Sequence, residues 1–488
     1  MEIRIDELMH SSGVGFGTSG ARGLVEKMTD QVCYAYTRAF IQVLKQQGEL
    51  ASDASIAIAG DYRPSSPRIM GAVAMAIQDE GLHVINCGGI PSPAVAYFGQ
   101  IRAIPSIMVT GSHIPDDRNG IKFNKADGEI LKQDEQQIRA QTVSIPSAYF
   151  DADGSSTREM TLPNVDASAY TAYVERYTHF FTGQPLHGRH VALYEHSSVA
   201  RESLNDILTA LGAQVTKLGY SDIFMPVDTE AIRAEDVALA RQWAGEQTYD
   251  CIVSADGDGD RPLVSDEHGE WLRGDIAGIL TARYLGIDTL ATPVSSNTAV
   301  EKSGYFRHVA RTRIGSPYVI EAMNQALASS TRVAGYEANG GFLLANDLES
   351  NGHRLARLPT RDAVIVILAV MLLAARENKP ISALLTALPQ RYTASDRIKN
   401  FPTELSQAKL QAFAADRALL AETFRSLAGE LRDVDTTDGL RMTFANDAII
   451  HLRPSGNAPE LRCYTEAEST GQAHALNQQC LAMLAEWR

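Results

Sequence analysis

Short apolar runs and glycines recur along the chain in the order strand, helix, strand. The first copy places a strand-like run, a helix and a second strand at residues 55–60, 66–80 and 81–88. Segments of the same kind follow at 190–196, 199–211 and 212–219, and a looser copy lies at 289–296, 298–302 and 308–315. This alternation is typical of α/β units with parallel or mixed sheets. The pattern therefore predicts three related α/β domains.

The order changes from about Tyr392 onward. A helix-like segment at 404–431 precedes the strand-like runs GLRMTF, AIIHLRP and LRCYTEA and a final helix from Gly471, which indicates a smaller α+β domain. The polar stretch 151–164 reads as a linker, and the second unit gives way to the third between Pro262 and Gly274. We therefore expect domains at 1–155, 156–268, 269–390 and 391–488.

The longest apolar run, residues 363–375, is too short to cross a bilayer of about 30 Å as a helix. It follows Thr360, a good N-cap residue, and is predicted to be a buried core helix. The N-terminus lacks the basic and then apolar organisation of a signal peptide. With 44% hydrophobic and 21% charged residues, the composition is that of an ordinary globular protein.

Charge and cysteine content narrow the classes of partner. A net charge of −15 argues against nucleic acid and anionic membranes, which are approached through basic fields. The five cysteines are odd in number and form no C-x-x-C pair, so neither a disulfide framework nor a zinc site is indicated. We expect a cytoplasmic protein that acts on a small molecule, as a monomer or a weak dimer.

The loop VTGSHIPDDRNGIKF at residues 109–123 lies between two strand-like runs. Its serine, Ser112, follows a glycine at a strand end, where a hydroxyl can be exposed for attack, with His113 beside it. Lys122 is available to balance the charge of a phosphate. Any long turn also contains serine, proline, aspartate and glycine, so the loop alone permits a structural reading as well.

The loop SADGDGDRP at residues 254–262 directly follows an apolar strand. Asp256, Asp258 and Asp260 alternate along it and offer hard oxygen ligands suited to Mg²⁺ or Ca²⁺. A calcium hand, closed by Glu267, is the alternative reading, but its sixth position is Arg261 instead of glycine and its preceding segment is strand-like. A plain Asp-Gly turn would leave three carboxylates to repel one another.

Two further glycine-containing loops offer polar groups. In GYEANGGF, at 335–342, Glu337 and Asn339 could bind vicinal sugar hydroxyls, although a solvated turn would look the same. In RPSGNAPELR, at 453–462, the guanidinium of Arg453, the hydroxyl of Ser455 and exposed backbone N–H groups could cradle a phosphate, with a hairpin turn as the alternative.

In this order, the loops resemble those of the α-D-phosphohexomutase family, which includes phosphomannomutases, phosphoglucomutases and phosphoglucosamine mutases. FGTSGARG, at 16–23, is similar to the opening motif of that family, TGSHIP to its phosphoserine loop and DGDGDR to its metal loop. EANGG is similar to its sugar-recognition loop and RPSGNAP to its phosphate loop. Together they span nearly the whole chain. The resemblance implies four domains around a cleft, to which each contributes one loop.

The resemblance also implies roles for individual residues. Mg²⁺ would be bound by Ser112, which carries the phosphate, and by Asp256, Asp258 and Asp260. Arg22, Lys122 and His113 would serve at the transferred group. The substrate-binding residues would be Arg261, Glu337, Asn339, Arg453, Ser455, Gly456 and Asn457, with Arg313 beside Gly315 as the alternative holder of the distal phosphate. A bisphosphorylated hexose would be both the intermediate and the activator.

The chain departs from the common family patterns at several positions. Asn339 replaces serine, Gly341 replaces the histidine of some bacterial members, Ile114 replaces asparagine and Asn457-Ala458 replaces threonine and glutamate. The serine and metal loops are intact, so the reaction class is expected to hold. By likeness of the serine loop, the expected activity is interconversion of mannose 6-phosphate and mannose 1-phosphate. Phosphoglucomutase and phosphoglucosamine mutase are the next choices, and a metal-dependent sugar phosphatase is a further rival.

Overall fold

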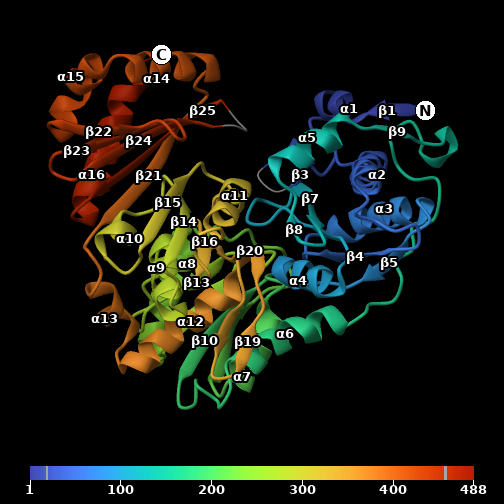
Figure 1. Ribbon diagram of the computed structural model, residues 1–488, viewed down its shortest axis with the longest axis horizontal. Helices are drawn as coiled ribbons and strands as arrows, with labels where there is room; N and C mark the ends of the chain where they lie inside the picture. The colour runs from blue at the N-terminus through green and yellow to red at the C-terminus, as the bar shows by residue number, and fades with distance from the viewer. Residues whose placement is uncertain (18–19, 456–458, 488) are drawn as a thin grey trace.

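The computed structural model describes residues 1–17, 20–455 and 459–487. Within them, three mixed sheets with flanking helices precede one antiparallel sheet (Figure 1). The N-terminal unit, drawn in blue, packs on the second and third units through α4 (Ser92–Arg102) and α6 (Ser168–Phe180), and the C-terminal domain lies beyond the third unit. These sheets fall within the predicted ranges 1–155, 156–268, 269–390 and 391–488, whose limits remain predictions.

The first unit is built on parallel strands with an antiparallel return. Its central strands, in spatial order, are β5 (His83–Asn86), β4 (Ser55–Gly60), β6 (Ser106–Val109) and β7 (Arg118–Lys125), of which β7 is antiparallel to β6. The sheet continues through β3 (Ala21–Leu24) to β2 (Gly15–Phe16).

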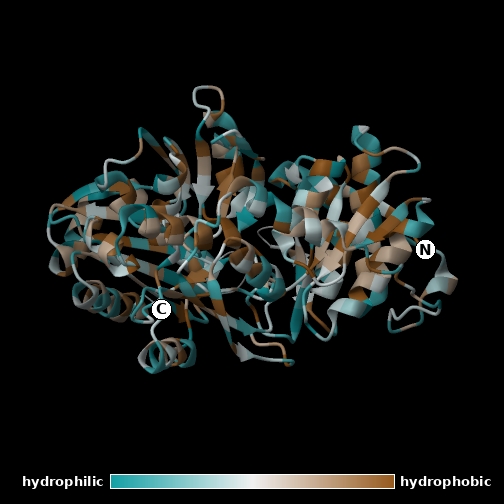
Figure 2. Ribbon diagram, turned by 90° about the horizontal axis from the view of Figure 1, so that it is seen from below, coloured by the Kyte–Doolittle hydropathy of each residue, from teal (hydrophilic) through white to brown (hydrophobic). Residues whose placement is uncertain are grey.

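Both faces of this sheet are buried. Because side chains alternate along a strand, Ile56 and Ile58 lie in one core with helices α2 (Asp30–Gln47) and α3 (Ser66–Asp79). Ala57 and Ala59 belong to another core with α4 (Ser92–Arg102). Figure 2 shows the hydrophobic residues concentrated along strands and inner helix faces. A sheet covered on both faces explains why β4 reads as a continuous apolar run.

The second and third units repeat the strand order of the first. The second sheet runs β11 (Gln214–Tyr220), β10 (His190–His196), β12 (Cys251–Ala255), β13 (Pro262–Val264). The third runs β15 (His308–Thr312), β14 (Thr289–Pro293), β16 (Val333–Tyr336), β17 (Phe342–Leu344), and then β20 (Leu358–Asp362). In both, the first three strands are parallel and the fourth is antiparallel. The predicted relation between the three units is confirmed.

Helix α12 (Ala363–Glu377) is the buried core helix that its apolar sequence predicts, and it packs against α9 (Gly274–Leu285). The predicted N-cap is wrong, because Thr360 lies inside β20. Asp362 caps the helix instead, its carboxylate accepting a hydrogen bond from the Val364 N–H. Among the described residues, no helix is long and apolar enough to cross a membrane.

The C-terminal domain carries an antiparallel sheet. Its spatial order is β21 (Tyr392–Lys399), β25 (Glu460–Ala467), β24 (Ile449–Pro454), β23 (Leu440–Phe444) and β22 (Leu431–Asp435). Three helices accompany it: α14 (Thr403–Ala415), α15 (Arg417–Ala428) and α16 (Thr470–Ala485).

One helix prediction needs correction. The single segment expected at 404–431 is two helices and the start of a strand, because the Asp416 side chain turns back to cap α15 through the N–H groups of Ala418 and Leu419. In the third unit, the helix expected at 298–302 is confirmed as the single turn α10 (Ala299–Lys302). The longer helix α11 (Ser316–Ala326) follows β15 and packs on β14 and β16.

Candidate active site

Three of the predicted loops occupy equivalent places in the related sheets. Each joins the last parallel strand of its unit to the antiparallel strand beside it, β6 to β7, β12 to β13 and β16 to β17. The carboxyl ends of parallel strands are where α/β folds place their ligands. Residues from all three loops, namely Ser112, Arg261, Glu337 and Asn339, line one cavity of about 300 Å³.

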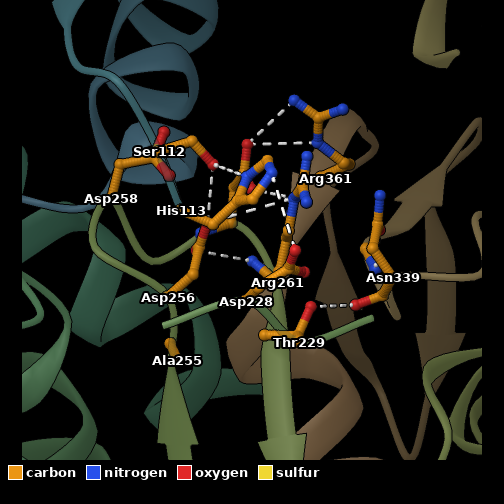
Figure 3. Close-up of polar contacts among 12 residues, drawn as sticks. Ser112, His113, Asp228, Thr229, Ala255, Asp256, Asp258, Arg261, Asn339 and Arg361 are labelled. Atoms are coloured by element: carbon orange, nitrogen blue, oxygen red, sulfur yellow. Dashed lines mark hydrogen bonds and ion pairs between the residues drawn. The ribbon is translucent and has the colours of Figure 1, made fainter. Parts of the chain in front are cut away.

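Ser112 is held in a constrained conformation at the base of this cavity. Its φ of 56° lies in the left-handed region, which costs a non-glycine residue about 1–3 kcal/mol. The Ser112 N–H donates to Thr110 Oγ1 at 2.7 Å, and Ser112 Oγ donates to Asp256 Oδ2 at 2.7 Å (Figure 3). The hydroxyl therefore faces the aspartate loop of the second unit.

The conformation of the serine loop depends on Arg63, which the sequence analysis missed. This arginine is 1% exposed, and its guanidinium forms an ion pair with Asp61, with 3.0 Å between Nε and Oδ2. It donates four hydrogen bonds of 2.6–3.0 Å to the loop carbonyls of Ser112, Ile114, Pro115 and Arg118. A charged pair directly after the buried strand β4 was the available signal in the sequence.

The three aspartates fit a divalent cation. Each offers an oxygen within 4.8 Å of the others, and all three side chains are buried. Asp258 Oδ1 and Asp260 Oδ1 have no hydrogen-bond partner among the described residues. Burial, and then the neighbouring Asp258 and Asp260, raise the pKa of Asp256, because the three carboxylates are crowded together. Hard, orphaned oxygens of this kind suit Mg²⁺.

The calcium-hand alternative is not supported by the geometry. Its closing residue, Glu267, accepts hydrogen bonds from the backbone N–H and the hydroxyl of Ser382. The loop also follows strand β12, whereas a calcium hand follows a helix.

The predicted basic residues surround the aspartates. Lys122 Nζ donates to Asp258 Oδ2 and Asp260 Oδ2, each at 2.6 Å. Burial opposes its charge, but the two carboxylates outweigh burial and raise its pKa. Burial, followed by the charge of Arg261, lowers the pKa of Arg22 to about 10, so Arg22 stays charged at neutral pH. Both Lys122 and Arg22 line the cavity.

His113 differs from these cations. Its Nδ1 lies 3.3 Å from Ser112 Oγ. Burial, followed by the charges of Arg261 and Arg22, holds its pKa far below the usual range of histidine. The imidazole is therefore a neutral hydrogen-bonding partner of the serine.

The third loop brings Glu337 and Asn339 to the same cavity. Asn339 is held from both sides, because its carbonyl accepts from Thr229 Oγ1 at 2.7 Å and its Oδ1 accepts from the Gly341 N–H at 3.0 Å. Glu337 is 4% exposed and accepts a hydrogen bond from Arg361 at 3.0 Å. The sequence analysis missed Arg361, although an arginine inside the apolar stretch LPTRDAV was a signal.

The residues predicted to hold the distal phosphate are less closely assembled. Gly315 lines the cavity, whereas Arg313 Nε donates to the Thr437 carbonyl at 3.1 Å. Arg453 forms an ion pair with Asp438, 2.8 Å between Nε and Oδ2, and Ser455 is buried. Gly456 and Asn457 lie outside the described residues. The C-terminal domain contributes Arg462 to the cavity, a residue without a predicted role.

Comparisons with known proteins agree with this arrangement. Models of phosphoglucomutase/phosphomannomutase match residues 13–148 (α/β/α domain I), 273–392 (α/β/α domain III) and 400–482 (C-terminal domain). A phosphomannomutase of Salmonella muenchen is 43% identical over 96% of this chain and 95% of its own length. One from Sinorhizobium fredii is 42% identical over 97% of this chain and 99% of its own length.

More distant relatives share the fold. A phosphoglucosamine mutase of Alkaliphilus oremlandii is 25% identical over 97% of this chain and 99% of its own length. The crystal structure of a putative phosphomannomutase from Thermus thermophilus superposes with a TM-score of 0.74 at 20% identity, covering 97% of this chain and 99% of that one.

A serine that lines the cavity and is hydrogen-bonded to an acidic triad, with near-full-length identity above 40% to known mutases, defines an isomerase of the phosphohexomutase class. The chain belongs to the phosphoglucomutase/phosphomannomutase family.

Proposed function

We propose that the protein interconverts mannose 6-phosphate and mannose 1-phosphate through a phosphorylated Ser112. The observation that carries the proposal is the 2.7 Å contact between Ser112 Oγ and Asp256, within a cavity that Glu337 and Asn339 also line. Nucleophile, acidic triad and hydroxyl-binding groups thus meet in one place. Mannose is favoured because the relatives at 42–43% identity are phosphomannomutases, whereas the phosphoglucosamine mutase relatives are 25–28% identical.

The reaction follows from the charges around the serine. The Oγ–phosphorus bond of phosphoserine breaks as a sugar hydroxyl forms a new bond to phosphorus. The proton that this hydroxyl loses ends on Ser112 Oγ, which gives a bisphosphorylated hexose and a free serine hydroxyl. Lys122, Arg22 and Arg261 balance the charge of the transferred group, because phosphoryl transfer depends mainly on alignment and charge stabilisation. The sugar then turns, and its other phosphate returns to Ser112.

Asp256, Asp258 and Asp260 would hold Mg²⁺, which when bound supplies positive charge to the phosphoryl oxygens. Glu337 and Asn339 would hold sugar hydroxyls in both orientations. Arg453, Ser455, Gly456 and Asn457 would hold the non-reacting phosphate, with Arg313 near Gly315 as the alternative. A bisphosphorylated hexose would act as activator by loading phosphate onto Ser112.

The setting proposed for this activity is the cytoplasm, and the active form a monomer or weak dimer. All five cysteines are buried free thiols, which supports a reducing compartment. Ser112, Arg261, Glu337 and Asn339 all come from this chain, so the proposed roles require no residue of a second subunit.

A coupled assay with mannose, glucose and glucosamine 1-phosphates, Mg²⁺ and a bisphosphate activator tests the proposal. We expect the highest kcat/KM with mannose 1-phosphate. Intact-protein mass spectrometry should show one added phosphate, which is absent in Ser112→Ala. Release of inorganic phosphate in place of hexose 6-phosphate would favour the phosphatase. A Ser112→Ala variant that is still phosphorylated and fully active would overturn the assignment of the nucleophile.

A further inference from the structure

Arg361 is a buried cation that connects two of the loops. It lies in β20 of the third unit and is 3% exposed. Its Nε and Nη2 lie 3.1 and 3.0 Å from Asp260 Oδ2, and its Nη1 donates to Glu337 Oε2 at 3.0 Å. One guanidinium therefore joins a carboxylate of the aspartate loop to the carboxylate of the sugar loop.

The path of this side chain explains a glycine in the sugar loop. A Cβ atom at Gly341 would lie 2.5 Å from both Cγ and Cδ of Arg361, far inside van der Waals contact. Gly341 is not among the described glycines with positive φ, so space and not backbone conformation demands glycine there. The stem of Arg361 is fixed between the loop backbone and two carboxylates, so it cannot move aside without losing those contacts.

The two carboxylates depend on Arg361 to different degrees. Asp260 also accepts a hydrogen bond from Lys122 at 2.6 Å, and Arg261 Nε lies 3.7 Å from its Oδ1. Within the described part of the chain, Arg361 is the side chain that donates a hydrogen bond to the Glu337 carboxylate. Loss of Arg361 should therefore free the Glu337 carboxylate to rotate while the aspartate loop keeps other cations.

We propose that Arg361 is the positioning residue for sugar specificity. It engages Glu337 Oε2 and so leaves Oε1 to accept a hydrogen bond from a sugar hydroxyl. Through Asp260 it keeps that acceptor at a fixed position relative to the phosphoryl-transfer site. This inference rests on the proposed function and adds to it the element that aligns sugar recognition with the reacting serine.

The test compares Arg361→Gln and Arg361→Lys with Glu337→Gln, using Arg357→Gln as an exposed control immediately before the same strand. The kcat and KM are measured with mannose 1-phosphate and with a panel of mono-deoxy analogues. A hydrogen bond to a charged group accounts for roughly a 10- to 100-fold change in equilibrium. We expect each Arg361 variant to lose that much kcat/KM for mannose 1-phosphate. For the mono-deoxy analogue whose kcat/KM is unchanged by Glu337→Gln, we expect little loss in the Arg361 variants as well.

Two further results decide between positioning and a general structural role. Combining Arg361→Gln with Glu337→Gln should be no worse than either change alone, because both remove the same interaction. The charge retained in Arg361→Lys preserves compensation of Asp260, so this variant should keep its melting temperature while losing discrimination. Full discrimination in both Arg361 variants, or additive losses in the double variant, would overturn the proposal.

Gly341→Ala provides an independent test without changing Arg361. It should lower the melting temperature and reproduce the loss of discrimination. In an Arg361→Ala background, Gly341→Ala should lower the melting temperature less, because the space is already cleared. A Gly341→Ala variant with normal stability and specificity would contradict the packing argument. The melting temperatures can be measured whether or not the wild-type protein has mutase activity. They therefore distinguish failure of this inference from failure of the proposed function.

Discussion

The repeated α/β units and the C-terminal domain hold their loops in different ways. In the repeated units, the loops are hydrogen-bonded to one another. Ser112 Oγ donates to Asp256 and Lys122 donates to Asp258, each within 2.7 Å. In the C-terminal domain, Arg453 is paired with Asp438 of the same domain. Asp438 and its neighbour in turn meet the third unit, where the Ile314 N–H donates to Asp438 Oδ2 at 3.0 Å and Arg313 donates to the Thr437 carbonyl.

This difference matches the two tasks of a mutase. Transfer of a phosphoryl group requires charges that are already in place when the reaction begins, so bonded loops favour the chemical step. A sugar that must turn within the cleft requires a second binding site, which can release the sugar and bind it again. The C-terminal loop that is proposed to hold the non-reacting phosphate has its arginine paired within its own domain, so it can change its contacts without disturbing the serine and aspartates.

The largest expected effect comes from Asp258→Asn, which disrupts the contact between the serine and aspartate loops. Turnover should fall by at least about 10³-fold, because charge stabilisation of the transferred group is lost. The melting temperature in chelator should stay nearly unchanged, because the weakened contact with Lys122 is offset by removing one of three crowded negative charges. Thermal denaturation with and without Mg²⁺ checks this, and a fall of several degrees in chelator would show that Asp258 is structural.

Arg63→Met should produce the next largest effect. It removes the donors that hold four carbonyls of the serine loop and leaves Asp61 buried without its ion pair, a loss of about 3–5 kcal/mol in the free energy of unfolding. Because misplacing a reactive group by about 1 Å can cost 10²-fold, kcat should fall about 10²-fold. Urea denaturation and steady-state kinetics measure the two effects. Unchanged kcat in a folded variant would mean that the loop keeps its conformation without Arg63.

Arg63 and Arg361 also show what the sequence could not reveal. Ser112 and the three aspartates stand in compact motifs, each next to a predicted strand, so their positions could be predicted. The partners of Arg63 are mainly backbone carbonyls about 50 residues away, which have no signature in residue type. Arg361 acts on Asp260, 101 residues away, and the need for glycine at position 341 follows from packing that the chain order does not display.

Arg453→Ala tests the proposed phosphate contact of the C-terminal domain. Losing one charge-assisted contact to phosphate, about 1.5–3 kcal/mol, should raise KM roughly 10- to 100-fold while Ser112 still takes up phosphate. The sugar would be held at one end, so bisphosphorylated intermediate should leak into solution, where ³¹P NMR can count it during turnover. Wild-type KM with no leakage would move the distal-phosphate role to Arg313, near Gly315.

The smallest expected effect, and the most specific, is that of Asp438→Asn. Its carboxylate pairs with Arg453 and accepts a hydrogen bond from the Ile314 N–H, so a substrate phosphate that uses Arg453 has to replace that pairing. The asparagine oxygen can still accept from Ile314, whereas the charge that competes for the guanidinium is gone. Removing this half-buried ion pair should change the free energy of binding by about 1 kcal/mol, so KM should fall by up to about fivefold with kcat little changed. The gain should shrink at high salt, which screens the competing charge in the wild type. A higher KM in Asp438→Asn would instead show that the aspartate orients Arg453 for the substrate, and the C-terminal phosphate loop would then be as preorganised as the serine and aspartate loops.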